Sequence, residues 1–208
     1  MLRVSVKQGS LTDGEEHVLV NASNTGAKLG SGVSGAIRAA CGAGYQERVL
    51  AALHARYGGP MSPGAVLVTD AGSHPHARFV AHVAVMDYRQ GFTGDSFPTL
   101  ALIEGACREL WVALEALGER ELSVAMVALG AGTGRLGARD TTRVACETLK
   151  AHVASTPGSA IAEVVFYGYE LPGFLAMADA VSRVFELPAG ALSDEVREYL
   201  ARMRAEEG

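Results

Sequence analysis

Residues 18–37 read VLVNASNTGAKLGSGVSGAI. The apolar run Val18–Val20 predicts a buried strand that ends near Asn21, and the glycine-rich stretch Gly30–Gly35 predicts a loop. A short helix is expected from about Ala36. Such a loop places several unobstructed N–H groups near a helix N-terminus, where hydrogen bonds and the helix dipole stabilise a phosphate. The stretch therefore predicts a strand, a candidate phosphate loop and a helix in succession.

A second segment of the chain has the same plan. Leu122–Leu129 is a nearly continuous apolar run, which is typical of a strand buried on both faces of a sheet. The glycine-rich loop Gly130–Gly137 follows it, and a helix is expected over Asp140–Val153. Two such loops at one edge of a sheet would hold a diphosphate from both sides, although a glycine-rich turn between strand and helix is as often purely structural.

The remaining pattern alternates strands with helices. Short strands are expected over 2–6, 65–69, 78–86 and 164–167, and helices over 45–57 and 100–117. Beyond Pro172 two more helices are expected, the second with Ser193 as its N-cap. This alternation predicts an α/β fold with a largely parallel sheet covered on both faces, in which ligands bind beyond the carboxyl ends of the strands.

The composition limits the classes of function. The chain has 208 residues and a net charge of -5, which favours one domain with a C-terminal extension and disfavours binding to long nucleic acids. No G-x-x-x-x-G-K-[ST] motif is present, and the three cysteines show neither disulfide nor zinc spacing. No segment reaches the ~20 apolar residues that span a bilayer. We therefore expect a cytoplasmic protein with no membrane contact, no metal and no cofactor; the sequence leaves the oligomeric state open.

Four segments together resemble the macrodomain family. Val20–Asn24 and Gly30–Ile37 are similar to its V-N-A-x-N…G-x-G-V-x-x-A-I signature, Val80–Val83 resembles its internal strand, and Gly132–Gly137 resembles its second phosphate loop. The resemblance implies a three-layer α/β/α sandwich with a mixed, largely parallel sheet of about six strands. It also implies a macrodomain over residues 1–174 and a C-terminal helical extension over residues 175–208, packed on or beside it.

The resemblance further implies that the chain binds ADP-ribose or an ADP-ribosylated macromolecule, with a role for each part of the site. Ser10 and Leu11 would meet the adenine, and Tyr169 the adenine or the proximal ribose. Asn21 and Asn24 would lie near the distal ribose. The two loops would hold the diphosphate through Gly30, Ser31, Gly32, Val33, Gly132, Thr133, Gly134, Arg135 and Leu136.

The sequence departs from the family at three positions. Ser10 stands where an Asp often accepts a hydrogen bond from the adenine amino group, which is expected to weaken binding by ~1 kcal/mol. Ser34 and Arg38 stand where the hydrolytic branch often has Asp and His, and serine is a poor general base at neutral pH. Asn24 is then the candidate left for a catalytic role, as a residue that positions water or the ribose. Binding of ADP-ribose is therefore the expected function. The alternative is hydrolysis, either of ADP-ribosyl esters or of metabolites such as ADP-ribose 1''-phosphate.

Some of these residues also have a purely structural interpretation. Asn21 and Asn24 could bond the local backbone, as asparagines in turns do. Arg135 could be a solvated loop cation instead of a phosphate ligand. A hydrogen-bonded core position is favoured for His82, which lies within an apolar strand. Residues 87–89, which follow that strand, either line the cleft or cap a loop.

Overall fold

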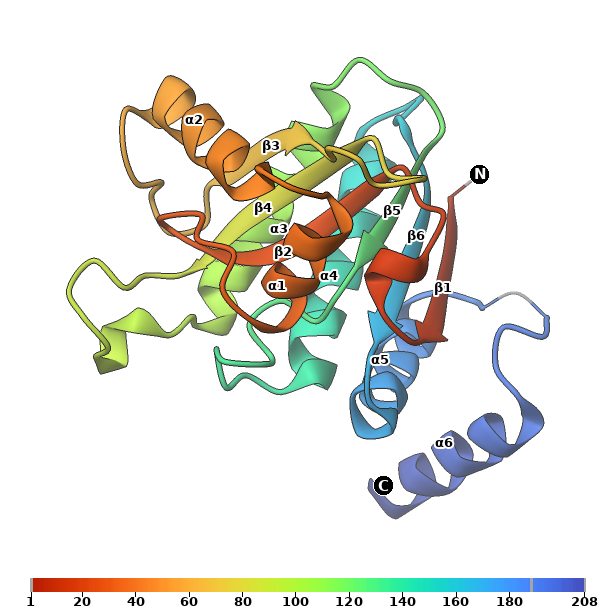
Figure 1. Cartoon of the computed structure of the whole chain (residues 1–208). Helices are drawn as coiled ribbons and strands as arrows, with labels where there is room; N and C mark the ends of the chain where they lie inside the picture. The colour runs from red at the N-terminus through yellow and green to blue at the C-terminus, as the bar shows by residue number, and fades with distance from the viewer. Residues whose placement is uncertain (1, 188, 208) are drawn as a thin grey trace.

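Six strands form one sheet in the computed structural model, which describes residues 2–187 and 189–207 (Figure 1). Their order across the sheet is β1-β6-β5-β2-β4-β3. The strands are β1 Arg3–Gln8, β2 Val18–Asn24, β3 Val66–Asp70, β4 Phe79–Met86, β5 Leu122–Met126 and β6 Ile161–Gly168. All neighbours are parallel except β3, which runs antiparallel to β4 at the edge. The mixed, largely parallel sheet is confirmed, and it brings the carboxyl ends of β2, β4, β5 and β6 to one edge.

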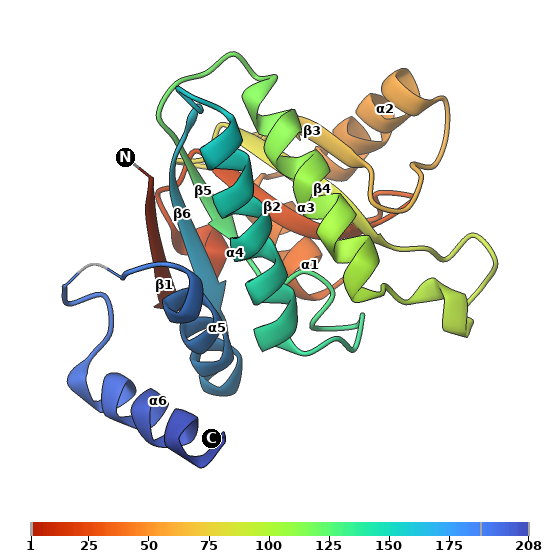
Figure 2. The same cartoon turned by 180° about the vertical axis from the view of Figure 1, so that it is seen from behind.

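Helices cover both faces of this sheet. One face carries α1 Gly32–Ala40 and α2 Tyr45–Tyr57 (Figure 1), and the opposite face carries α3 Leu100–Glu115, α4 Ala138–Ser155 and α5 Leu171–Val184 (Figure 2). Two 3₁₀ helices, η1 Leu11–Asp13 and η2 Gly94–Ser96, and the last helix, α6 Asp194–Glu207, complete the described elements. The expected α/β/α sandwich is therefore confirmed. None of the helices in the described part of the chain is long and apolar enough to cross a membrane.

Two apolar layers follow from the alternation of side chains along the strands. In β2, Val18 and Val20 belong to the layer with α3, α4 and α5, whereas Leu19 belongs to the layer with α1 and α2. All three side chains are fully buried. Burying an aliphatic side chain typically contributes ~1.5–3 kcal/mol, so packing on both faces fixes the central strand and the loop that leaves it.

The observed bounds differ from the expected ones around the two glycine-rich stretches. The helix expected over 45–57 is confirmed with the same ends. The strand expected over 122–129 already ends at Met126, because a turn at residues 129–130 leads into the second glycine-rich loop. The first helix begins at Gly32 and not near Ala36, so the glycine-rich stretch itself supplies the first turn of α1.

The α5 helix belongs to the layer that covers the sheet, and α6 follows it at the C-terminus. α5 packs against α4, β1 and β6, and a Cβ on Gly168 of β6 would lie only 2.4 Å from the Cα of Phe174. The predicted domain boundary after residue 174 falls inside α5. The N–H of Val196 donates to the Oγ of Ser193 at 3.3 Å, which confirms the expected N-cap of α6.

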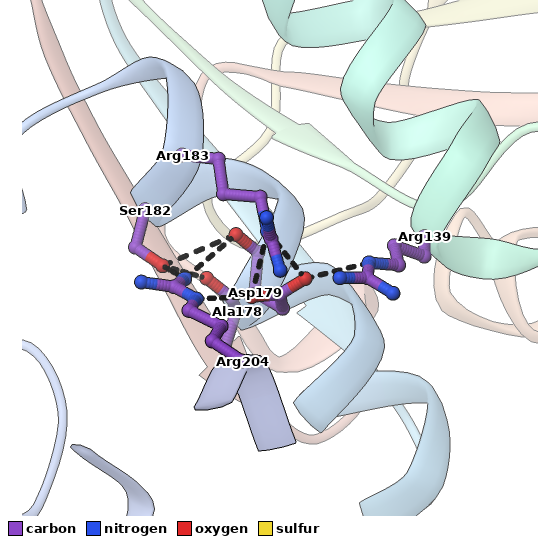
Figure 3. A network of polar contacts seen from close by, with 6 residues as sticks. All are labelled: Arg139, Ala178, Asp179, Ser182, Arg183 and Arg204. Carbon is purple, nitrogen blue, oxygen red and sulfur yellow. Dashed lines mark hydrogen bonds and ion pairs between the residues drawn. The ribbon is translucent and has the colours of Figure 1, made fainter. Parts of the chain in front are cut away.

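A buried carboxylate ties α6 to the sandwich (Figure 3). Asp179 of α5 is fully buried and lies 2.6 Å from the guanidinium of Arg139 at the start of α4. Arg183 of α5 and Arg204 of α6 lie 2.9 and 2.6 Å from the same carboxylate. Burial raises the pKa of Asp179, but hydrogen bonds from Arg204 and Arg183 outweigh it and hold this pKa below its ordinary value. The ionised Asp179 thus joins three helices at one point.

Candidate ligand-binding site

A groove runs along the carboxyl edge of the sheet, between the loops that follow β2 and β5. It consists of two adjoining cavities of about 370 and 590 Å³. Gly32, Val33 and Val127 line both cavities, so the two lie side by side. The first cavity is also lined by Asn24, Lys28, Gly30, Ser31, Ser34, Tyr88, Gly132, Thr133 and Gly134, and the second by Ser10, Leu11, Asp13, Tyr167 and Tyr169.

The first glycine-rich loop presents backbone amides from the end of a helix. α1 begins at Gly32, whose φ of 56° lies in the left-handed region that glycine tolerates. Ser31 precedes it as an extended N-cap whose side chain makes no capping bond. The N–H groups of Gly32, Val33 and Ser34 have no partner inside the helix, as is general for a first helical turn. Because these residues line the groove, their amides and the positive end of the helix dipole are available to an anion.

The second glycine-rich loop is braced by its own backbone. The N–H groups of Arg135 and Leu136 donate to carbonyls at the start of the same loop, at 3.0 and 3.1 Å. Gly134 packs so tightly that a Cβ on it would lie 2.3 Å from the carbonyl oxygen of Gly130. This arrangement leaves the N–H groups of residues 132–134 without a partner in the part of the chain that the structure describes, and these residues line the groove.

A chain of buried hydrogen bonds lies beneath α1. The Oγ of Ser34 donates to Oδ1 of Asn21 at 2.8 Å, and Nδ2 of Asn21 donates to Nδ1 of His82 at 3.1 Å. The Nε2 of His82 lies 3.3 Å from the hydroxyl of Thr69 and 3.4 Å from that of Tyr45. Burial lowers the pKa of His82 to about 4, so its ring is neutral at pH 7. The core position of His82 is confirmed, and Asn21 orients Ser34 from below the groove.

Asn24 lines the groove, and the polar atoms of its side chain bond the loop that follows. Its Oδ1 accepts hydrogen bonds from the N–H groups of Gly26 at 3.1 Å and Lys28 at 3.3 Å. Its Nδ2 donates to the carbonyl of Lys28 at 3.0 Å. These local backbone bonds shape the approach to Gly30. A catalytic role for Asn24 stays a prediction.

Comparison with known proteins agrees with this geometry. The Macro domain family model matches residues 20–145, more than half of the chain. This chain belongs to the macro domain family. A macro domain-containing protein of Streptomyces nogalater is 32% identical over 166 residues, which cover 80% of this chain and 84% of that protein. An uncharacterized protein of Mycobacterium tuberculosis is 29% identical over 197 residues, and these cover 95% of this chain but only 47% of the mycobacterial protein. This macrodomain thus spans about half the length of that relative.

A solved macrodomain shares the fold. The Trypanosoma brucei macrodomain in complex with ADP-ribose matches with a TM-score of 0.68 and 20% sequence identity. The match covers 86% of this chain and 69% of the other. The resemblance drawn from the sequence motifs is confirmed at the level of family and fold.

One end of the macrodomain groove is formed by η1 and by the chain after β6. Ser10 is the N-cap of η1, and its Oγ bonds the hydroxyl and the N–H of Thr12 at 2.8 and 3.3 Å. Leu11 is buried, whereas Tyr169 is 78% exposed. Asp13, an exposed residue, lines the same end, although no sequence pattern had singled it out. Asp13 therefore offers a second side-chain hydrogen-bond acceptor at this end, beside Ser10.

The opposite end of the groove lies after β4. Tyr88 lines the first cavity there. Asp87 accepts several hydrogen bonds from Arg89, which hold the pKa of this carboxyl well below its ordinary range. Tyr88 thus lines the cleft while its two neighbours cap the loop. The guanidinium of Arg135 lies 4.7 Å from the ring centroid of Phe97 and is not part of the groove lining.

The structure brings most of the predicted site residues to one groove. Those that line it are Ser10, Leu11, Asn24, Gly30, Ser31, Gly32, Val33, Gly132, Thr133, Gly134 and Tyr169. Asn21, Arg135 and Leu136 do not line it: Asn21 is buried beneath α1, and the other two brace the second loop. Lys28 also lines it without having been predicted, and its position between the two halves of the family signature was the available signal.

The first cavity offers donors for an anion and little equipment for proton transfer. Among the described residues that line it there is no carboxylate and no imidazole. The hydroxyl proton of Ser34 is directed to Asn21 and away from a ligand. The described part of the chain contains no group of three or more His, Cys, Asp or Glu residues that could hold a metal.

Proposed function

We propose that this macrodomain binds ADP-ribose, either free or attached to a macromolecule, with the diphosphate between the two loops. One observation carries the proposal. Residues 32–34 of the first turn of α1 and residues 132–134 line the same groove, and their amides have no partner among the described residues. Donors on two sides suit the two phosphates of a diphosphate, and backbone amides can bind them without a large positive surface. The Trypanosoma brucei macrodomain, which shares this fold, is in complex with ADP-ribose.

The other groove residues extend the proposal to the rest of the ligand. The ammonium of Lys28 adds positive charge at the first cavity. Ser10 and Asp13 offer acceptors for an adenine amino group, and Tyr169 offers an exposed ring for stacking. Asn24 and the Tyr88 end then remain for the distal ribose.

The same geometry favours binding over hydrolysis. A hydrolase needs a group that activates water, and a serine without a basic partner is a poor general base. Ser34 hydrogen-bonds Asn21, and the described residues that line the first cavity include no carboxylate or imidazole. We expect no release of ADP-ribose from a protein that carries it on Asp or Glu side chains. Release that is lost in Asn24→Ala would instead establish the hydrolase alternative.

Calorimetry with ADP-ribose and with AMP tests the binding function. ADP-ribose is expected to bind at least about tenfold more tightly than AMP, because AMP offers one phosphate to two sets of amides. A melting-temperature increase with ADP-ribose should accompany the heat. Absence of both signals at millimolar ADP-ribose would contradict the proposal.

The state of the cysteines gives an indication of the cellular compartment. Cys41, Cys107 and Cys146 are free and buried, which suits a reducing compartment. We propose a cytoplasmic location on this ground, and cell fractionation tests it.

A further inference from the structure

An aromatic cluster stands at the Tyr88 end of the groove. The ring of Tyr88 stacks on that of Phe92, with centroids 5.4 Å apart and an interplanar angle of 11°. Phe97 meets Phe92 edge-on at 5.4 Å, and the guanidinium of Arg135 covers Phe97. Phe92 is 66% exposed, although it is a large apolar side chain. The cluster therefore presents aromatic surface to solvent beside a cavity that Tyr88 itself lines.

The loop that carries these rings is held in shape by hydrogen bonds. The Oγ of the buried Ser96 donates to the carbonyl of Gly91 at 2.8 Å and accepts from the N–H of Thr93 at 3.0 Å. The N–H of Asp87 donates to the carbonyl of Ser96 at 3.1 Å. Thr25, directly after β2, donates its hydroxyl to Asp87 at 3.0 Å. An exposed ring on a loop fixed in this way is pre-organised, which lowers the entropic cost of stacking a ligand on it.

The groove thus has an aromatic side chain at each end. The backbone amides that are proposed to bind a diphosphate lie between these ends. Tyr169 stands exposed at one end, and Tyr88 backed by Phe92 stands at the other. In ADP-ribose only the adenosine end carries a base, and the distal ribose carries a hydroxyl at its anomeric carbon. Such a ligand leaves one aromatic end of the groove without a ring to stack on.

We infer that the Tyr88–Phe92 cluster is a second base-binding subsite, so that the groove takes a diphosphate with a nucleobase ribonucleoside at each end. The inference rests on the proposed diphosphate site. Aromatic side chains stack on any base, since every base has a π face. The positive charge of Arg135 beside the cluster disfavours a cationic ring and favours a neutral base.

Diadenosine diphosphate is the matched probe, because it is ADP-ribose whose distal ribose carries adenine. Its symmetry also places a base at each end of the groove in either orientation. Calorimetry on the whole chain should give a dissociation constant at least about fivefold lower than that of ADP-ribose, as expected from one added base stack. Phe92→Ala should bring the two constants to within about twofold of each other. Tyr199→Ala removes a ring that is 43% exposed on α6 and should preserve the preference.

The outcomes separate this inference from the function on which it rests. Binding of ADP-ribose without a preference for diadenosine diphosphate overturns the second subsite alone. A preference that survives in Phe92→Ala also overturns it. Failure of both ligands to bind the wild type overturns the diphosphate site and the subsite together. Circular dichroism and thermal melting establish that each variant is folded.

Discussion

The loop before α1 and the loop before α4 both follow a buried strand, yet their amides are held in place differently. In the first loop the donors are the opening N–H groups of α1, and Ser34 of that helix is anchored to Asn21 and His82 in the core. In the second loop the donors belong to residues 132–134, and the loop is closed by its own backbone bonds ahead of α4. The position of the first loop therefore depends on a buried polar network. The shape of the second loop depends on the close backbone contact that glycine permits at position 134.

This difference shows that one sequence pattern can produce anion donors by two physical means. A helix N-terminus adds its dipole to the hydrogen bonds. A loop of successive free amides supplies a concave nest without a helix of its own. Substitutions in the second loop should act mainly on ligand affinity and loop shape, whereas disturbance of the network under the first should act on folding stability.

The largest effect is expected from a negative charge in the second loop. Gly132 has room for a side chain, since a Cβ there would meet nothing within 4 Å. Gly132→Glu should abolish ADP-ribose binding, because a carboxylate ~4 Å from a phosphate costs about 4 kcal/mol at an effective dielectric constant of ~20. Gly132→Gln has nearly the same size and no charge, and calorimetry should show a much smaller loss. Unchanged affinity in Gly132→Glu would place the diphosphate elsewhere.

A somewhat smaller effect is expected from acidification, and it concerns the support of the first loop. The pKa of His82 is lowered to about 4, below the ordinary value near 6.5, so the unfolded chain binds a proton that the folded chain resists. Above about pH 6.5 the protonation of His82 has no effect on the free energy of unfolding. As the pH falls from 6.5 to 4, this free energy should decrease by roughly 3 kcal/mol. Denaturant unfolding of wild type and His82→Gln over this pH range measures it. If the free energy of unfolding changed equally with pH in the two proteins, the pH dependence would not come from His82.

The smallest of the three effects tests the shape of the second loop. Gly134→Ala places a Cβ 2.3 Å from the carbonyl oxygen of Gly130, so the backbone must shift. We expect a loss of about 1–2 kcal/mol in the free energy of unfolding and weaker ADP-ribose binding. Gly132→Ala is the matched control in the same loop, with open space at the new methyl group. If both variants behave alike, the close contact at Gly134 does not define the loop.

Much of the fold was predictable because its signals are local. The helix 45–57 and the strand that becomes β4 follow from periodicity within single segments. The partner of Asn21 was not predictable in this way. Asn21 and His82 lie in different strands, and the parallel register of β2 and β4 places them opposite one another. That register depends on packing of both apolar layers, which no single segment encodes.

The site residues show the same contrast between local signals and tertiary contacts. The family signature led to residues 30–33 and 132–134, which all line the groove. Side-chain roles were harder to predict, since long side chains choose among partners that folding brings close. The guanidinium of Arg135 lies over the ring of Phe97, which is distant in sequence, and a phosphate contact of Arg135 stays a prediction.

The sequence by itself determined the order of strands and helices and the presence of two glycine-rich turns at one sheet edge. It could do so because apolar periodicity and glycine clusters act over a few neighbouring residues. Only the tertiary structure decided which amides stay free, which side chains support them, and that Asp179 gathers arginines from three helices. These outcomes depend on hydrogen bonds and ion pairs between residues far apart in the chain, and such partners meet only once strand register and helix packing are fixed.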